Sequence, residues 1–155
     1  MPNTYTQLYT QFVFAVKGRQ NLISKKHKEE LHKYITGIVQ KRNHKMIAIN
    51  CMPDHAHIFV GMNPAQSISD LARDIKSNSS TLITDKKLVS GKFYWQEGFG
   101  AFSYSHSHIG NVARYIENQE EHHRAVTFKE EYLMFLKKFN VEYKEQYLFE
   151  WIEDI

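Results

Sequence analysis

The chain has few of the residues that build disulfides, metal clusters or linkers: one cysteine, three prolines and seven glycines in 155 residues. A single cysteine, Cys51, excludes an internal disulfide and any zinc site made of several cysteines. No apolar run approaches the length of a membrane-spanning helix, and the first residues lack the charged-then-apolar order of a signal segment. We therefore expect a cytoplasmic protein without membrane contact, in which Cys51 packs in the core.

The sequence also lacks repeats, low-complexity stretches and a glycine-rich phosphate loop. Its hydrophobic share of 42% is that of an ordinary globular protein, and its length suffices for one domain with a proper core. The net charge of +3 is uneven: residues 17–45 carry nine Lys or Arg against two Glu, whereas residues 117–155 carry five against ten acidic residues. The basic first third is a candidate surface for a polyanion, although ordinary solvated helix faces explain the same charges equally well.

The spacing of apolar residues predicts the order strand, helix, strand, strand, helix, strand, helix, helix. These elements are expected at residues 6–16, 24–39, 45–52, 54–62, 67–83, 92–105, 108–122 and 127–139. The order is typical of an α+β, ferredoxin-like or RRM-like sandwich, a mostly antiparallel sheet with helices on one face. We expect a single domain over residues 1–155, with a core at about 5–125 and a C-terminal helix and tail at about 126–155.

Two histidines in the fourth element carry the first candidate chemistry. Side chains alternate along a strand, so His55 and His57 point to one face while Ala56 and Ile58 point to the other. Two imidazoles on a rigid, half-buried strand make a metal-binding pair. The pattern alone is weak, because histidines are common on partly exposed strands.

A tyrosine in the seventh element carries the second candidate chemistry. Ile109, Val112 and Ile116 belong to the apolar stripe of this predicted helix, and Tyr115 lies beside that stripe. Gln119 is one turn further on the same face. Tyr115 is therefore placed to present its hydroxyl to another surface, although a boundary tyrosine in water has the same spacing.

The two motifs together resemble those of the single-tyrosine HUH transposases of the insertion sequence 200/605 type. Four blocks look like those of the family, in its order and spacing: residues 53–57, 75–80, 95–103 and 115–123. The main departure is Ala56, where these enzymes carry a bulkier apolar residue. Because that position faces away from the histidines, we expect looser packing beneath the strand and an intact site.

The resemblance implies a DNA transposase that cleaves and rejoins single-stranded DNA at hairpin-flanked ends through a 5′-phosphotyrosine. It implies Tyr115 as the catalytic nucleophile and His55, His57 and Gln119 as ligands of a divalent metal. This set of neutral donors suits Mg²⁺ or Mn²⁺, and imidazole favours Mn²⁺. A bacterial or archaeal cell, where the protein acts at the nucleoid, is the implied setting.

The resemblance further implies a homodimer, in which the tyrosine helix of one subunit completes the histidine site of the other. A tyrosine that reaches the metal of its own chain fits the sequence equally well. Two other functions also stay open: a domesticated relative that nicks hairpins without mobilising an element, and a non-catalytic module that binds single-stranded nucleic acid.

Other polar residues receive weaker assignments. Candidate DNA contacts lie on the second predicted helix, where polar side chains share a face away from much of the apolar stripe: Arg73, Lys76, Ser79 and Ser80. Asp54 is interpreted as a turn residue, with a hydrogen bond to a ligating histidine as the alternative. His122 is interpreted as structural, with a role as ligand or proton acceptor as the alternative. His106, His108 and His123 are expected at the surface or at helix ends.

Overall fold

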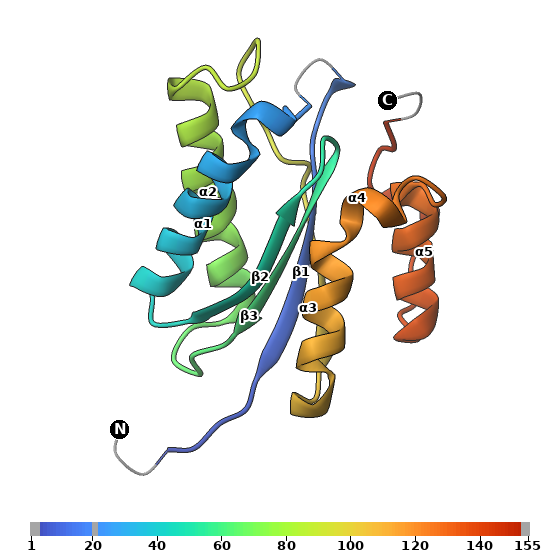
Figure 1. The fold of residues 1–155 in the computed structure, drawn as a ribbon. Coiled ribbons are helices and arrows are strands. Elements are labelled where there is room, and N and C mark those ends of the chain that lie inside the picture. The colour runs from blue at the N-terminus through green and yellow to red at the C-terminus, as the bar shows by residue number, and fades with distance from the viewer. Residues whose placement is uncertain (1–3, 20–21, 153–155) are drawn as a thin grey trace.

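A computed structural model describes residues 4–19 and 22–152, and its centre is a four-stranded antiparallel sheet (Figure 1). The strands are β1 (Tyr9–Ala15), β2 (Lys45–Cys51), β3 (His55–Gly61) and β4 (Gly100–Tyr104). They are ordered β2-β3-β1-β4, and each neighbouring pair is antiparallel. The tight turn at Pro53 and Asp54 joins β2 to β3 as an antiparallel hairpin. The α+β, ferredoxin-like fold predicted from the sequence is confirmed.

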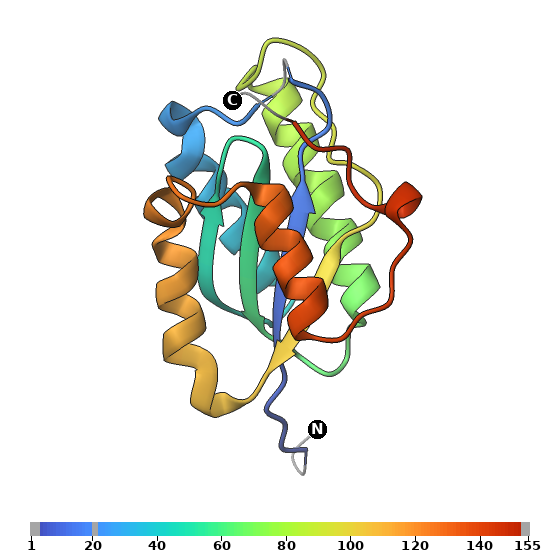
Figure 2. The same cartoon turned by 90° about the vertical axis from the view of Figure 1, so that its right-hand side faces the viewer.

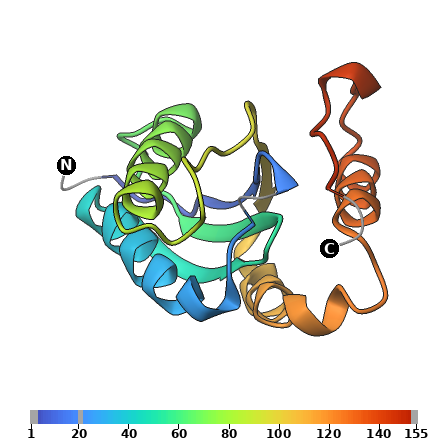
Figure 3. The ribbon, with the colours of Figure 1, turned by 90° about the horizontal axis from the view of Figure 1, so that it is seen from above.

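The longest helices, α1 (Lys28–Lys41) and α2 (Ile68–Asp85), pack side by side on one face of the sheet (Figures 1 and 3). The sequence predicts helices on this face only. The opposite face has helices as well, because the aromatic and apolar residues of the C-terminal part also pack on the sheet: α3 (Ile109–Glu117), α4 (Gln119–His122) and α5 (Phe128–Lys138). Figure 2 shows α5 in front of the strands, so the β3 face away from α1 and α2 is covered. Short 3₁₀ turns complete the described elements, η2 (Lys25–His27), η3 (His106–His108) and η4 (Glu145–Tyr147).

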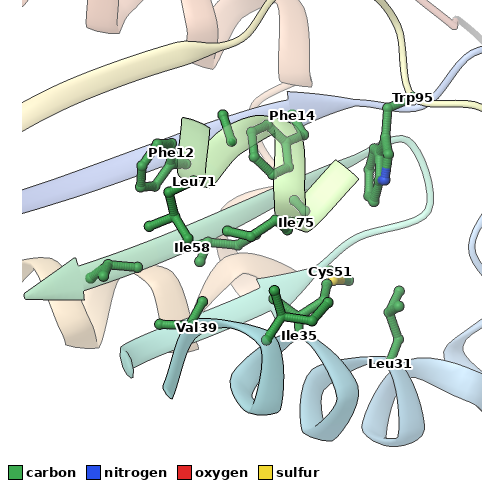
Figure 4. Close-up of a cluster of buried hydrophobic side chains, with 14 of the residues drawn as sticks. Phe12, Phe14, Leu31, Ile35, Val39, Cys51, Ile58, Leu71, Ile75 and Trp95 are labelled. Carbon is green, nitrogen blue, oxygen red and sulfur yellow. The ribbon is translucent and has the colours of Figure 1, made fainter. Parts of the chain in front are cut away.

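The register of β1 and β3 decides which side chains meet which helices. Phe14 lies opposite Ala56 and Val13 opposite His57, so each pair shares one face. Phe12, Phe14, Ala56, Ile58 and Val60 belong to the core against α1 and α2, part of which Figure 4 shows. Ala56 is fully buried there. His55 and His57 therefore point away from this core, as strand alternation predicts. Their face of the sheet is the one towards α5.

Two elements differ from their predicted extents. The strand expected at 92–105 reduces to β4 and an isolated bridge between Val16 and Trp95, because Gly98 has a positive φ of 77° that extended backbone does not allow. The helix expected at 108–122 divides at Asn118, whose ψ of 22° separates α3 from α4. Gln119 therefore begins a new helical turn rather than continuing the face of α3.

The C-terminal segment is fastened to the rest of the fold at both of its ends. Thr127 and Glu130 form a capping box at the start of α5. Phe149 packs on Phe128 and Tyr132, and the Gln96 side chain exchanges two hydrogen bonds of 2.7 Å with the backbone of Glu150. Within the described ranges, no helix is both long and apolar enough to cross a membrane.

His32 on α1 provides a pH-sensitive contact to the sheet. Its Nε2 accepts a hydrogen bond of 2.9 Å from the backbone N–H of Cys51, and burial, with a contribution from the charge of Lys28, lowers the pKa of His32 to about 4. Because the folded pKa lies below the unfolded one, stability is lost as the pH falls from about 6.5 to 4. We expect a loss on the order of 1 kcal/mol, less than the full shift because solvent screens this partly exposed ring.

NMR titration of the His32 ring checks this expectation directly. His32→Gln offers the Cys51 N–H a neutral acceptor that does not titrate, so its stability should fall less steeply over the same pH range. An ordinary histidine pKa in the folded protein would contradict the assignment.

Candidate metal and nucleophile site

His55 and His57 project from β3 into a closed space beneath α5. Their exposed fractions are 1% and 0%, and their ring centroids lie 5.1 Å apart. The Nδ1 atom of each ring is already engaged: that of His55 lies 2.7 Å from Asp54 Oδ1, and that of His57 lies 2.7 Å from Gln11 Nε2. Both Nε2 atoms therefore point towards α4 and α5.

Gln119 reaches the same space because the chain breaks at Asn118. The Asn50 side chain on β2 donates to the carbonyl of Ile116 at 2.8 Å, which holds the end of α3 against the sheet. Gln119 then begins α4 with no exposed surface, and its Oε1 lies 3.2 Å from His55 Nε2. The structure thus brings together the three predicted ligands, His55, His57 and Gln119.

Tyr115 approaches the histidines from α3 of the same chain. Its ring packs edge-on against His57 with centroids 6.1 Å apart. Its hydroxyl donates to Glu131 Oε2 and lies 3.2 Å from His122 Nε2. The predicted nucleophile therefore lies beside the predicted metal pair, linked to it by Glu131.

Glu131 in the first half of α5 is the central residue of the site, and no motif in the sequence indicates it. Its Oε1 lies 2.9 Å from His57 Nε2 and 3.1 Å from His123 Nε2, and its Oε2 accepts from Gln119 Nε2 at 3.0 Å. Only 2% of the residue is exposed. Acidic residues are common in the first turn of a helix, so Glu131 does not stand out in the sequence. Its contact with β3 joins distant segments, and no residue spacing predicts such a contact.

The charges of this cluster oppose one another. Burial acts to raise the pKa of Glu131, but the charge of His57 and the hydrogen bonds from His123 and His57 outweigh it, so the pKa lies well below its usual range. Burial lowers the pKa of His57, against the attraction of Glu131. Burial and the negative charge of Glu131 both raise the pKa of Tyr115. At neutral pH Glu131 is therefore a carboxylate and Tyr115 is a phenol.

The donor set fits a divalent cation. Asp54 is an acceptor for His55 Nδ1, so the neutral ring carries its proton on Nδ1 and turns the lone pair of Nε2 towards Gln119 Oε1, another lone pair. A cation between these two atoms would bind both lone pairs. His55, His57 and Gln119 supply nitrogen and oxygen donors of the kind that Mn²⁺ and Mg²⁺ bind.

Three further residues lie where the sequence left alternatives or predicted otherwise. Asp54 contacts Nδ1 of His55, a predicted ligand, and this contact agrees with the second of its two interpretations. His122 lies within reach of the Tyr115 hydroxyl, in a position suited to a proton acceptor. His123 lies at the C-terminal end of α4, the second of its two expected positions, and not at the surface. Its Nε2 points into the site, 2.9 Å from Gln119 Oε1 and 3.1 Å from Glu131 Oε1. The turn after α4 directs the ring inward.

A cavity of about 410 Å³ opens onto the tyrosine side of this site. It is lined by Tyr104, His108, Asn111, Val112, Tyr115, His122, Glu131, Met134, Phe135 and Lys138. Its volume lies in the range of ordinary ligand pockets. The Tyr115 hydroxyl is thus reachable from outside, whereas the histidine pair is enclosed.

The candidate DNA contacts lie on α2, across the sheet from Tyr115. Ser79 is fully buried, and its hydroxyl donates to Ile75 O at 2.6 Å and accepts from Trp95 Nε1 at 2.9 Å. Lys76 donates to the carbonyls of Gln96 and Gly98 at 2.8 and 2.6 Å. Arg73, Lys76 and Ser80 line a shallow hollow with residues 94–99, so the structure does not bring them to the metal pair.

Comparisons with known proteins agree with this geometry. The family model described as "Transposase IS200 like" matches residues 4–119. The ISDra2 transposase TnpA of Deinococcus radiodurans is 23% identical over 121 residues, covering 74% of this chain and 86% of that protein.

Two solved structures share the fold. A crystal structure of a transposase from Deinococcus radiodurans R1 has a TM-score of 0.58 at 20% identity, covering 76% of this chain and 94% of that one. The structure of a REP-associated tyrosine transposase bound to a REP hairpin has a TM-score of 0.59 at 17% identity, covering 80% of this chain and 73% of that one. Since the family model spans three quarters of the sequence, from residue 4 to residue 119, this chain belongs to the IS200-like transposase family.

Proposed function

We propose that this chain cleaves and rejoins single-stranded DNA at hairpin-flanked ends through a covalent 5′-phosphotyrosine at Tyr115. The observation that carries the proposal is one carboxylate, Glu131, which contacts His57 through one oxygen and the Tyr115 hydroxyl through the other. A nucleophile and a metal-binding pair are thereby held at adjoining positions, as phosphodiester cleavage requires.

A divalent ion, Mg²⁺ or Mn²⁺, is held by His55, His57 and Gln119 in this proposal. When bound, it polarises the scissile phosphate and offsets the charge that repels a nucleophile. Asp54 and Gln11 hold the two imidazoles in orientation through their Nδ1 atoms. Phe128 stacks on His55 at 4.0 Å and keeps water from that ring.

The Tyr115 oxygen attacks phosphorus, and the bond from phosphorus to the 3′ oxygen breaks. The departing strand keeps a 3′-hydroxyl, and the 5′ phosphate stays on Tyr115. Glu131 Oε2 and His122 Nε2 are the two acceptors beside the phenol, so they are placed to take its proton. A free 3′-hydroxyl reverses the step on a new strand, so the reaction consumes no external energy source.

The contacts of Tyr115 support an active site within one chain. The hydroxyl touches Glu131 of its own subunit, and the ring touches His57 of its own subunit. We accordingly propose that a homodimer, if formed, does not exchange tyrosines. Arg73, Lys76 and Ser80 on the α2 side are proposed as phosphate contacts for DNA outside the cleavage site, and Ser79 instead fixes Trp95.

The proposal is tested by incubating the protein with single-stranded oligonucleotides that carry a hairpin from the sequence flanking its gene. With Mn²⁺ or Mg²⁺ present, we expect a protein band shifted by covalent DNA on a denaturing gel. Removal of the metal with EDTA should abolish the shift. Cleavage that leaves no DNA on the protein would contradict the phosphotyrosine step.

A further inference from the structure

The metal site contains two donors that lie outside the segment matched by the family model. That segment ends at Gln119, whereas His123 and Glu131 follow it. We propose that His123 and Glu131 are metal ligands in this chain, in addition to His55, His57 and Gln119, so that α5 contributes an anionic carboxylate to the site. The inference rests on the proposed function only in placing a metal at the histidine pair.

The spacing of the four donors supports this assignment. One ligand atom from each of His55, His57, His123 and Glu131 lies within 4.8 Å of all the others. Glu131 Oε1 is 2.9 Å from His57 Nε2, 3.1 Å from His123 Nε2 and 3.5 Å from His55 Nε2. Neighbouring donors bound to an octahedral ion at about 2.1 Å are about 3.0 Å apart. The observed distances bracket that value.

The protons of His123 support it independently. His123 Nδ1 lies 2.6 Å from the carbonyl oxygen of Val126, which can only accept a hydrogen bond. When the ring is neutral its proton is therefore on Nδ1, and Nε2, the atom that lies beside Glu131 Oε1 and Gln119 Oε1, has a free lone pair. Without a metal, a proton on Nε2 makes the hydrogen bond to Glu131, and a cation bound at this point would take the place of that proton.

Two of the three imidazoles also show the arrangement typical of ligating histidines, in which the nitrogen away from the metal donates its proton to a fixed acceptor. His55 donates to Asp54, and His123 donates to the backbone carbonyl of Val126. His57 is held differently: its Nδ1 accepts from Gln11 Nε2, because Gln11 Oε1 accepts from the Tyr104 hydroxyl at 2.9 Å.

The second oxygen of the carboxylate stays with the nucleophile. Glu131 Oε2 accepts from Tyr115 and from Gln119 Nε2, so a metal on Oε1 leaves both contacts in place. Glu131 thereby joins the cation and the phenol in one rigid unit, and Gln119 is adjacent to both.

Metal affinity without DNA tests the inference. Calorimetric titration with Mn²⁺ and Zn²⁺ should show binding to the wild-type chain and at least about tenfold weaker binding to Glu131→Gln, which keeps the side-chain shape but removes the charge. Glu130→Gln is the matched control, one residue before Glu131. The Glu130 side chain is exposed, and glutamine also serves in a capping box. Equal affinity of wild type and Glu131→Gln, with both folded by circular dichroism, would overturn the inference.

A second measurement uses the wild-type chain alone, so it decides the matter even if the variant does not fold. X-ray absorption of the Zn²⁺ or Co²⁺ complex counts imidazole ligands, and three are expected, from His55, His57 and His123. Two imidazoles would overturn the inference. Because neither readout requires cleavage, a chain that binds metal as described but forms no DNA adduct would refute the proposed function and leave this inference standing.

Discussion

Tyr115→Phe is expected to abolish the covalent protein–DNA band while leaving hairpin binding intact. The substitution removes one oxygen, the proposed nucleophile, and keeps the ring that packs on His57 and Phe135. Adduct yield on single-stranded DNA should fall by at least about 10³-fold, because neither Glu131 nor His122 replaces a phenol oxygen in a stable phosphotyrosine. Binding, measured by gel shift with the same hairpin oligonucleotide, should change little.

Tyr34→Phe is the matched control for this prediction. Tyr34 lies on α1 with 37% of its surface exposed, across the sheet from the site. Its loss of a hydroxyl should leave adduct formation at the wild-type level. A Tyr115→Phe chain that still forms the adduct would assign the chemistry to another residue, and a module that only binds nucleic acid would show no adduct with any variant.

A mixture of Tyr115→Phe and His57→Ala chains is expected to stay inactive. Each chain lacks one half of the site, and the structure places both halves in the same subunit. His57→Ala should itself lose activity, because it removes a proposed ligand and leaves Glu131 without the closest of its histidine partners, His57 Nε2 at 2.9 Å. Co-expression of the two chains with tags of different size, followed by the adduct assay, makes the measurement.

The tags also identify the result that would contradict this account. If subunits shared sites, a dimer of the two variants would regain one intact site, and DNA would appear on the His57→Ala chain, which retains Tyr115. Recovery of that band would show that the tyrosine helix works on a partner subunit.

The predictable part of the site depended on short-range geometry. Strand alternation placed His55 and His57 on one face and Ala56 on the other, and helical spacing placed Tyr115 beside the buried stripe of α3. Those rules act over a few residues, so the sequence reports them directly.

The unpredicted part depended on contacts between distant segments. Glu131 meets His57 across 74 positions of sequence, only because the chain turns after α4 and lays α5 over β3. His123 was expected at the surface or at a helix end, and its turn into the site was not predicted for the same reason. Gln119 lies beside the histidines, as expected, but not for the expected reason. The prediction assumed one continuous helix from Tyr115 to Gln119, whereas the helix breaks at Asn118. The hydrogen bond from Asn50 to Ile116 holds the end of α3 so that Gln119 still reaches the site.

Mass spectrometry of the purified protein–DNA adduct tests the central claim most directly. After digestion of the protein and trimming of the DNA, the account predicts a nucleotide 5′ phosphate on the peptide that contains Tyr115, formed only when a divalent metal is present. A phosphate mapped to any other residue, or the same adduct formed in EDTA, would contradict a metal-assisted tyrosine nucleophile at this site.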